Sequence, residues 1–286
     1  MKKEKRLLWG FIDTKGDFVI EPKYDDARDF SEDLAVVRID WRRGYIDRSG
    51  AVVIEPQFQL ADSFDGGMAL VMLDDKWGFI NHEGEYVIQP VYDKAWNFTD
   101  DRAMVMSGGK YGFIDRSGAY VAGPVYDYAG DFHDGLAWVS VGGKYGYIGR
   151  DGKYKIEPVY DNAEDFHDGV ARVMKDGKFG YINTSGEAVE APVAAKPVTE
   201  FRDGLAPSRE GDKEGYIDES GQFAIEPKYA QAEPFSEGFA RVRAGAKSKW
   251  GYIDTAGKSP FKAKFPGAAD FHDGLARVMV EVVEEG

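Results

Sequence analysis

Short apolar runs and polar turns follow one another along this chain with a nearly fixed period. The clearest marker is a glycine that follows an aromatic residue in most copies. This glycine stands at Gly10, Gly44, Gly78, Gly112, Gly146, Gly180, Gly215 and Gly251. The intervals are 34 residues for the first five pairs, then 35 and 36. A repeat of this length predicts an architecture in which each unit buries its apolar face on its neighbours.

The third copy shows how one unit begins. Residues 76–80 are aromatic and β-branched, which predicts a strand. Asn81 opens and Gly84 closes the following turn, and we expect the asparagine side chain to accept hydrogen bonds from the turn's own amides. Residues 86–88 predict the second strand of the hairpin. Pro90 is expected to end that strand, because proline has no N–H for the ladder.

The second half of each unit starts with a Tyr-Asp pair. In the third copy Tyr92 and Phe98 are expected to be buried anchors of a short edge strand or crossing segment, and residues 103–105 predict another strand. We expect the Tyr-Asp pairs to make hydrogen bonds between units, since a buried phenol needs a partner. Each unit is therefore an antiparallel meander of three strands, or of four if the crossing segment pairs, and no helix is needed.

The repeating residues resemble the WG repeat of bacterial proteins. The segments that carry the resemblance are 9–13, 19–25, 76–80 and 250–254, which contain Trp-Gly-Phe-Ile-Asp, Val-Ile-Glu-Pro-Lys-Tyr-Asp and two further Trp-Gly runs. The resemblance covers nearly the whole chain. It implies a repeat architecture and brings no catalytic residues and no cofactor with it.

Departures from the repeat mark the places where a specialised surface is expected. Arg43 and Glu214 replace the aromatic residue before the glycine, and Trp41 lies two residues early, where it can fill the gap in the second copy. The two stretches that depart most are 187–214 and 258–267. Their unusual residues are Ala194, Pro197 and Pro207 in the first, and Ala263 and Phe265 in the second. We expect Pro197 and Pro207 to interrupt strands.

The positions of the two ends within the repeat favour a ring. The chain starts just before the strand of Trp9 and ends just after the strand at residues 275–280. In a ring this last strand would pair beside Trp9 and complete the first unit. We therefore predict one domain over residues 1–286, a closed eight-bladed β-propeller-like ring. An open β-solenoid is the alternative, because 34 residues is short beside propeller repeats of about 40–45.

Charge and composition narrow the possible partners. The chain has 36 Lys and Arg against 50 Asp and Glu, a net charge of −14, which disfavours nucleic acid as a ligand. It has no cysteine, so disulfides and thiolate metal sites are excluded. No signal peptide or membrane span is recognisable in the sequence, so we expect a cytoplasmic monomer that does not insert into membranes.

Metal and catalytic sites are not expected. His133, His167 and His272 share one repeat position, which polar residues occupy elsewhere, and successive units are expected to hold them too far apart for one metal ion. The Asp-x-x-Gly turns offer one carboxylate each, too few for calcium. No nucleophile–base motif is present. Acidic residues are plentiful, so a glycoside-acting hydrolase or lyase with carboxylates in a central channel remains an alternative.

Aromatic residues outside the repeat pattern are the better ligand candidates, because stacking of the units does not require them. They are Trp41, Trp96, Tyr128 and Trp138. We expect Trp96 and Tyr128 to lie on the same face of adjacent units and to form a contact patch. The leading hypothesis is a non-enzymatic binding or scaffold protein that presents a rigid acidic surface to a protein partner. The alternative is a carbohydrate or cell-envelope binder whose aromatic residues stack on sugars.

Overall fold

The computed structural model describes residues 4–191 and 200–284. Every regular element in these ranges is a β-strand, and the strands form eight antiparallel sheets. Six of the sheets described have four strands and two have three. The all-β repeat prediction is confirmed, because the eight copies of the sequence pattern form eight antiparallel sheets, each built from the end of one copy and the start of the next. No helix long and apolar enough to cross a membrane occurs in the ranges described.

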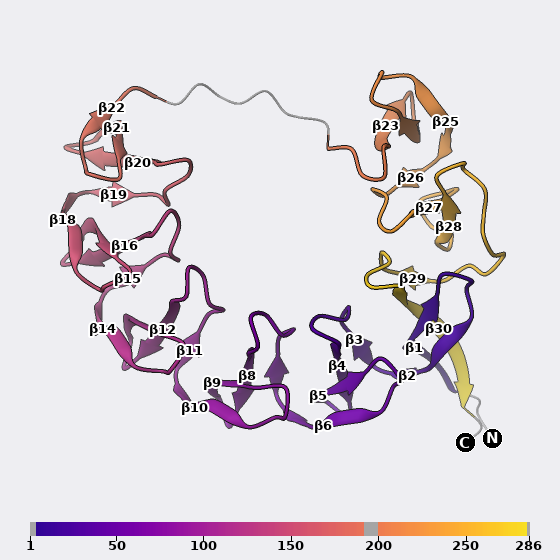
Figure 1. Ribbon diagram of the computed structural model, residues 1–286, viewed down its shortest axis with the longest axis horizontal. Helices are drawn as coiled ribbons and strands as arrows, with labels where there is room; N and C mark the ends of the chain where they lie inside the picture. The colour runs from indigo at the N-terminus through magenta and orange to yellow at the C-terminus, as the bar shows by residue number, and fades with distance from the viewer. Residues whose placement is uncertain (1–3, 192–199, 285–286) are drawn as a thin grey trace. The chain divides into compact units, whose positions relative to one another are not determined.

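The chain divides into two compact units, which are treated separately below. Unit 1 consists of the described residues of 1–58, 63–65 and 196–286. Its sheets, in spatial order of their strands, are β2 (Phe18–Tyr24), β1 (Glu4–Asp13), β30 (Leu275–Glu284) and β29 (Gly267–Ala268); β3 (Asp26–Ala27), β4 (Leu34–Ile39), β5 (Arg42–Asp47) and β6 (Val52–Phe58); β23 (Ala206–Glu210), β24 (Lys213–Ile217) and β25 (Phe223–Tyr229); and β26 (Gln231–Ala232), β27 (Phe239–Arg243) and β28 (Gly251–Asp254) (Figure 1).

Unit 2 consists of the described residues of 59–62 and 66–195. Its sheets are β7 (Leu60–Ala61), β8 (Ala69–Leu73), β9 (Lys76–Ile80) and β10 (Tyr86–Tyr92); β11 (Lys94–Ala95), β12 (Ala103–Ser107), β13 (Lys110–Ile114) and β14 (Tyr120–Tyr126); β15 (Tyr128–Ala129), β16 (Leu136–Val141), β17 (Lys144–Gly149) and β18 (Tyr154–Tyr160); and β19 (Asn162–Ala163), β20 (Val170–Lys175), β21 (Lys178–Asn183) and β22 (Ala188–Val189). The crossing segment therefore pairs as a short first strand, and a complete sheet of the repeat has four strands.

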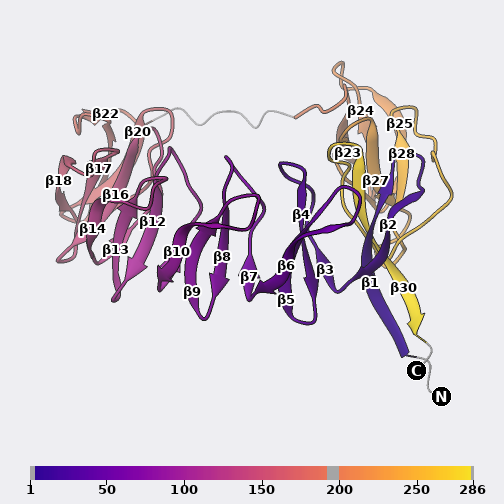
Figure 2. The same ribbon diagram turned by 60° about the horizontal axis from the view of Figure 1, so that its bottom comes forward.

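The first and last strands of the chain share one sheet in unit 1. Strand β1 pairs with β30 over ten residue pairs, from Glu4 opposite Glu284 to Asp13 opposite Leu275. Figure 2 shows the two strands running side by side toward the chain ends. The predicted pairing of the final strand beside Trp9 is thus confirmed.

Within each unit, aromatic pairs join successive sheets. The aromatic residue that follows the recurring glycine packs on the Phe anchor of the same copy, which lies in the next sheet, as in Phe113 with Phe132, whose ring centroids lie 5.1 Å apart. The equivalent pairs are Phe11–Phe30, Tyr45–Phe64, Phe79–Phe98, Tyr147–Phe166, Tyr216–Phe235 and Tyr252–Phe271, at 4.8–5.1 Å. Such pairs contribute roughly 0.5–1.5 kcal/mol each beyond simple burial. The predicted anchors are confirmed, and the core lies between successive sheets.

The recurring glycine is required because the neighbouring strand bulges over it. Strand β10 runs through Pro90 to Tyr92, so the prediction that this proline ends the strand is wrong. Tyr92 pairs with Trp77 and Ile88 with Phe79, which leaves extra residues on β10 as a bulge around the proline. A Cβ on Gly78 would lie 2.5 Å from the Ile88 carbonyl oxygen and 2.7 Å from the Pro90 nitrogen. Only glycine fits beneath this bulge.

The predicted turn and the Tyr-Asp link are both present. Asn81 Oδ1 accepts hydrogen bonds from the amides of Glu83 at 3.1 Å and Glu85 at 2.9 Å, which confirms the expected cap. Asp93 pairs with Lys76 Nζ at 2.5 Å and accepts a 2.8 Å bond from Gly108 N in the next sheet. The hydrogen bond from Lys76 holds the pKa of Asp93 below its usual value. In this copy the aspartate makes a bond to the next copy, as predicted, whereas the buried Tyr24 hydroxyl of the first copy has no hydrogen-bond partner among the described residues, so the reason given for the prediction is wrong there.

The two irregular stretches behave differently. Ala194 and Pro197 lie outside the described residues. Pro207 lies inside β23, opposite Tyr216, so the prediction that it interrupts a strand is wrong. Residues 258–266 form no strand, and the sheet that ends at β28 has three strands. Phe265 is nevertheless buried against Tyr252, with ring centroids 6.4 Å apart, and thereby replaces the usual tyrosine anchor.

Candidate binding site

A crevice between successive sheets is filled by an arginine in unit 1. Arg277 on β30 donates from Nε to Asp29 Oδ1 at 2.7 Å and from Nη1 to the Ala27 carbonyl oxygen at 2.9 Å. Its guanidinium carbon lies 5.1 Å from the centre of the Trp9 ring. The aspartate and the carbonyl belong to the next sheet. The arginine therefore joins two sheets and stacks on an indole while doing so.

The same arrangement recurs at the sheet before it. Arg241 on β27 donates to Asp270 Oδ1 at 2.7 Å and to the Ala268 carbonyl oxygen at 2.7 Å, and lies 5.3 Å from the Trp250 ring. A guanidinium over an aromatic ring beside a carboxylate is thus a recurring element of the repeat, and its place is set by strand register.

A variant of this arrangement occurs in unit 2. Arg172 on β20 lies 3.7 Å from the Phe179 ring centre and pairs with Glu164 Oε1 at 3.1 Å. Here the acid comes from the same sheet as the arginine, because the Glu164 amide bonds to the Arg172 carbonyl oxygen. The crevice therefore has two positions from which an acceptor can reach a guanidinium.

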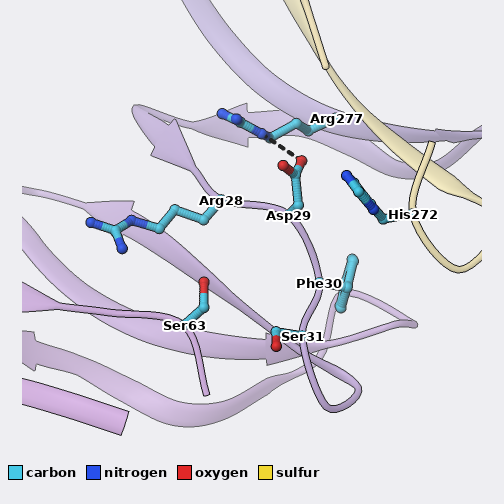
Figure 3. A pocket seen from close by; sticks show the side chains of 7 residues that line it. All are labelled: Arg28, Asp29, Phe30, Ser31, Ser63, His272 and Arg277. Atoms are coloured by element: carbon cyan, nitrogen blue, oxygen red, sulfur yellow. Dashed lines mark hydrogen bonds and ion pairs between the residues drawn. The ribbon is translucent and has the colours of Figure 1, made fainter. Parts of the chain in front are cut away.

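A polar pocket of about 410 Å³ lies beside the Arg277 crevice (Figure 3). It is lined by Arg28, Asp29, Phe30, Ser31, Ser63, His272 and Arg277. Figure 3 shows the Asp29 carboxylate turned toward Arg277. The Ser31 hydroxyl donates to the Phe64 carbonyl oxygen at 2.7 Å. The guanidinium of Arg277 and the Ser31 hydroxyl are thus engaged by the protein itself.

The corresponding crevice in unit 2 is open. Leu70 pairs with Phe79 as Arg277 pairs with Phe11, so Leu70 occupies the arginine position. Trp77 keeps the position of Trp9, directly before the recurring glycine. The result is a pocket of about 360 Å³, here called the Trp77–Trp96 crevice, lined by Asp62, Leu70, Trp77, Lys94, Ala95, Trp96 and Asn97.

Both acceptor positions of the arginine crevices are occupied by polar side chains in the Trp77–Trp96 crevice. The Asp62 amide bonds to the Leu70 carbonyl oxygen, which places Asp62 where Glu164 stands. Asn97 stands directly before its Phe anchor, as Asp29 does, and donates to Asp62 Oδ2 at 3.3 Å. Lys94 is an exposed cation at the rim. The crevice thus offers two half-buried indoles, a carboxylate and an amide.

The four predicted ligand residues are placed at different kinds of position. Trp96 lines the crevice and packs on Tyr111, with ring centroids 5.8 Å apart. Trp138 stands at the arginine position of its own sheet, packs on Tyr145 at 5.6 Å and covers Gly130, where any Cβ would clash with its indole. Packing accounts for Trp138, while Trp96 has one face directed to an open crevice.

Tyr128 and Trp41 are exposed. Tyr128 is 59% exposed and lines a separate pocket of about 550 Å³, which shares no lining residue with the Trp77–Trp96 crevice. The expected patch of Trp96 and Tyr128 is therefore not one pocket. Trp41 is 83% exposed in the β4–β5 hairpin turn, with a φ of 69° that is unusual for a bulky residue, and lies 5.6 Å from Arg38.

Trp77, Leu70, Asp62 and Asn97 were missed by reasoning from sequence. Trp77 belongs to the repeat pattern, which predicts a core position for it. The signal that could have found the crevice is Leu70, which stands where three other copies have arginine.

Two of the histidines lie closer together than expected. The rings of His133 and His167 have centroids 5.4 Å apart. The expectation that successive repeats hold the histidines too far apart for one metal ion is therefore wrong for this pair. Nearby, Asp131 and Asp165 each have a buried carboxylate oxygen without a hydrogen-bond partner. Burial, and then the charge of Asp165, raises the pKa of Asp131. Within the described residues, no group of three or more His, Cys, Asp or Glu is arranged to hold a metal ion.

The Asp-x-x-Gly turns use their carboxylates for local capping. Asp47 Oδ1 accepts bonds from Ser49 N, Ser49 Oγ and Ala51 N. The Ser49 hydroxyl is the main cause of the lowered pKa of Asp47. This use agrees with the sequence-based interpretation that such turns cap themselves.

Solved structures with a similar arrangement are distant in sequence. A eukaryotic initiation factor is 11% identical over 97% of this chain and 98% of its own, with a TM-score of 0.48. Hsv2p of Kluyveromyces lactis is 6% identical over 91% and 97%, with a TM-score of 0.37. The AfRom2 CNH domain is 9% identical over 92% and 99%, with a TM-score of 0.32. No curated protein sequence matches the chain significantly.

The family comparison agrees with the sequence resemblance. The family described as "WG containing repeat" matches seven segments, which together span more than half of the chain: 9–40, 44–77, 77–111, 111–145, 145–179, 215–247 and 250–281. The copy left unmatched is the one that follows Gly180 and includes residues outside the described ranges. Each matched segment contains the pairing strands and aromatic anchors described above. The chain therefore belongs to the WG-repeat family.

Proposed function

We propose that this chain is a non-enzymatic binding protein that docks a protein partner on unit 2, with the Trp77–Trp96 crevice as the recognition point. The observation that supports the proposal is that this crevice is open where the chain's own arginine fills the same position elsewhere. Aromatic side chains in a partly desolvated pocket are the usual anchors of protein interfaces.

Exposed apolar residues on unit 2 agree with this role. Val91, Val125 and Val159 hold the same position on β10, β14 and β18, and are 58%, 60% and 43% exposed. In Figure 1 these three strands lie along one margin of unit 2. The prolines within the strands blunt the exposed edge against aggregation, while the valines leave apolar surface for a partner.

The test compares two tryptophan variants in the intact chain. Partners are captured from native extract with the unaltered chain, Trp96→Ala and Trp41→Ala, then identified by cross-linking and mass spectrometry. We expect a partner that cross-links to unit 2, is retained by Trp41→Ala and is lost with Trp96→Ala. Equal recovery with all three proteins would place recognition elsewhere.

Carbohydrate is the second candidate ligand, because the same crevice combines two indole walls with the Asn97 amide. A glycan array with the unaltered chain and Trp96→Ala distinguishes this class. Saturable glycan binding that Trp96→Ala abolishes would replace the protein partner as ligand. Turnover on a panel of glycosides and esters, lost on mutation of one carboxylate, would contradict the non-enzymatic assignment.

A further inference from the structure

Resting on the proposed binding role, we propose that the Trp77–Trp96 crevice takes the guanidinium group of an arginine from a basic segment of the partner protein. The chain itself shows that a guanidinium fits this position, because arginine occupies it in three other sheets, at Arg172, Arg241 and Arg277. In unit 1 the group stacked on Trp9 and Trp250 is a guanidinium in both cases.

The aromatic wall needed for stacking is retained at Trp77. Arg277 and Arg241 each lie diagonally across a strand pair from the tryptophan before the recurring glycine. Leu70 has the same register relative to Trp77, and it is too short to reach the next sheet. Trp96 supplies a second aromatic wall. A planar cation between two indoles gains more than an exposed cation does, because it is partly desolvated.

The acceptors needed for a guanidinium are also retained. Arg277 is held by an acid of the next sheet and Arg172 by an acid of its own sheet. In the open crevice Asn97 holds the first position and Asp62 the second. A carboxylate can accept several hydrogen bonds, so a guest guanidinium can add to the contacts that Asp62 already makes, the one with Asn97 among them. Ala95 keeps the position of Ala27, whose carbonyl accepts from Arg277.

Charge favours a basic segment as the partner. The chain carries a net charge of −14, which attracts a cationic segment over a long range and speeds its association. Lys94 at the rim opposes this attraction locally. Removing the positive charge of Lys94 should therefore strengthen the binding of an arginine, whereas removing the negative charge of Asp62 should weaken it.

The test uses single-residue probes of matched shape. N-acetyl-arginine amide, its neutral isostere N-acetyl-citrulline amide and N-acetyl-lysine amide are titrated into the full chain at near-physiological salt. The indole N–H signals of Trp77 and Trp96 are followed by NMR and assigned with the two Trp→Phe variants. We expect both signals to shift saturably with the arginine probe, which binds at least about tenfold more tightly than citrulline.

A set of variants separates the crevice from general surface charge. Leu70→Arg should fill the crevice with an internal guanidinium and abolish probe binding, while Leu70→Met should retain it. Asp62→Asn should weaken arginine binding and Lys94→Ala should strengthen it. These two variants test the site even if Leu70→Arg does not fold. Trp41→Ala is the matched control, because its indole lies on another hairpin, beside Arg38.

The outcomes distinguish this inference from the proposed function. Equal binding of citrulline and arginine, or arginine binding unchanged in both Asp62→Asn and a folded Leu70→Arg variant, would overturn the guanidinium site. If a partner depends on Trp96 while the arginine probe does not bind, the inference fails and the binding role stands. If the probe binds in the crevice and no protein is captured, the guanidinium site stands and the protein partner fails.

Discussion

The bulge over the recurring glycine makes a sharp prediction for one substitution. Gly146 on β17 lies under the bulge of β18, and a Cβ there would be 2.5 Å from the Ile156 carbonyl oxygen and 2.6 Å from the Pro158 nitrogen. Both atoms belong to backbone, which cannot rotate away as a side chain can. Gly146→Ala must therefore displace the bulge or the strand.

Two controls isolate this effect. Gly251 holds the same repeat position, but its nearest neighbours are Lys264 side-chain atoms at 3.9 Å, because residues 258–266 form no bulged strand. Gly123 lies in unit 2, like Gly146, and no described atom lies within 4 Å of its would-be Cβ. None of the three glycines has a φ in the left-handed region. Alanine is therefore compatible with the backbone at both control positions.

The expected change in folding free energy is unfavourable for Gly146→Ala and neutral or favourable for the two controls. Forcing a methyl group into packed backbone costs about 1–3 kcal/mol of folding free energy. Replacing glycine by alanine also lowers the entropy of the unfolded chain, which stabilises the protein by about 0.4–1 kcal/mol where the site tolerates it. Gly146→Ala should thus lose stability overall. Gly251→Ala and Gly123→Ala should be neutral or more stable, so each should exceed Gly146→Ala by about 1–3 kcal/mol.

Urea denaturation followed by tryptophan fluorescence and far-UV circular dichroism measures these differences. Hydrogen exchange of the β17 and β18 amides shows whether the loss in Gly146→Ala is local to the bulge. Equal stability of Gly146→Ala and Gly123→Ala would refute the steric explanation for the repeat glycine.

Three further predictions follow from buried groups in unit 2. Asp131→Asn should raise Tm at neutral pH, because burial and the charge of Asp165 raise the pKa of Asp131, so that its ionised form destabilises the fold. An increase in Tm that persists at pH values where the carboxyl is protonated would contradict this cause. Burial raises the pKa of Tyr126 to about 12, above its ordinary value of about 10, so folding stability should fall as pH rises from about 10 to 12. Tyr126→Phe should flatten that fall in alkaline denaturation, and an unchanged slope would count against it. Phe132→Ala removes the ring packed on Phe113 and should lower the free energy of unfolding by about 3–5 kcal/mol, as measured by urea denaturation. A decrease below ~1 kcal/mol would mean that the core does not depend on this pair.

The strand pattern and the turns could be predicted because they depend on near neighbours in the sequence. The Asn81 cap, the buried Phe anchors and the pairing of the last strand beside Trp9 follow from local chemistry and from the phase of the repeat. The role of Pro90 could not be predicted in the same way. Its bulge depends on how two strands pair, and the recurring glycine is what lets the bulged backbone approach.

The lining of the Trp77–Trp96 crevice could be predicted only in part, for a related reason. Trp96 departs from the repeat, which marks it as a candidate, whereas Trp77 follows the repeat, which predicts a core position for it. The distance between His133 and His167 was misjudged because the spacing of adjacent turns depends on how sheets pack, which periodicity does not reveal.

By itself the sequence determined the repeat, the all-β class and the family, because each rests on residues that recur at fixed spacing. Only the tertiary structure decided where a ligand could enter. The Trp77–Trp96 crevice has one wall on β8 and β9 and the other beside β11, and its opening depends on Leu70 standing where three other sheets have arginine. The opening at Leu70 cannot be inferred from one sheet alone, because the acceptors of Arg277 in unit 1 belong to the neighbouring sheet.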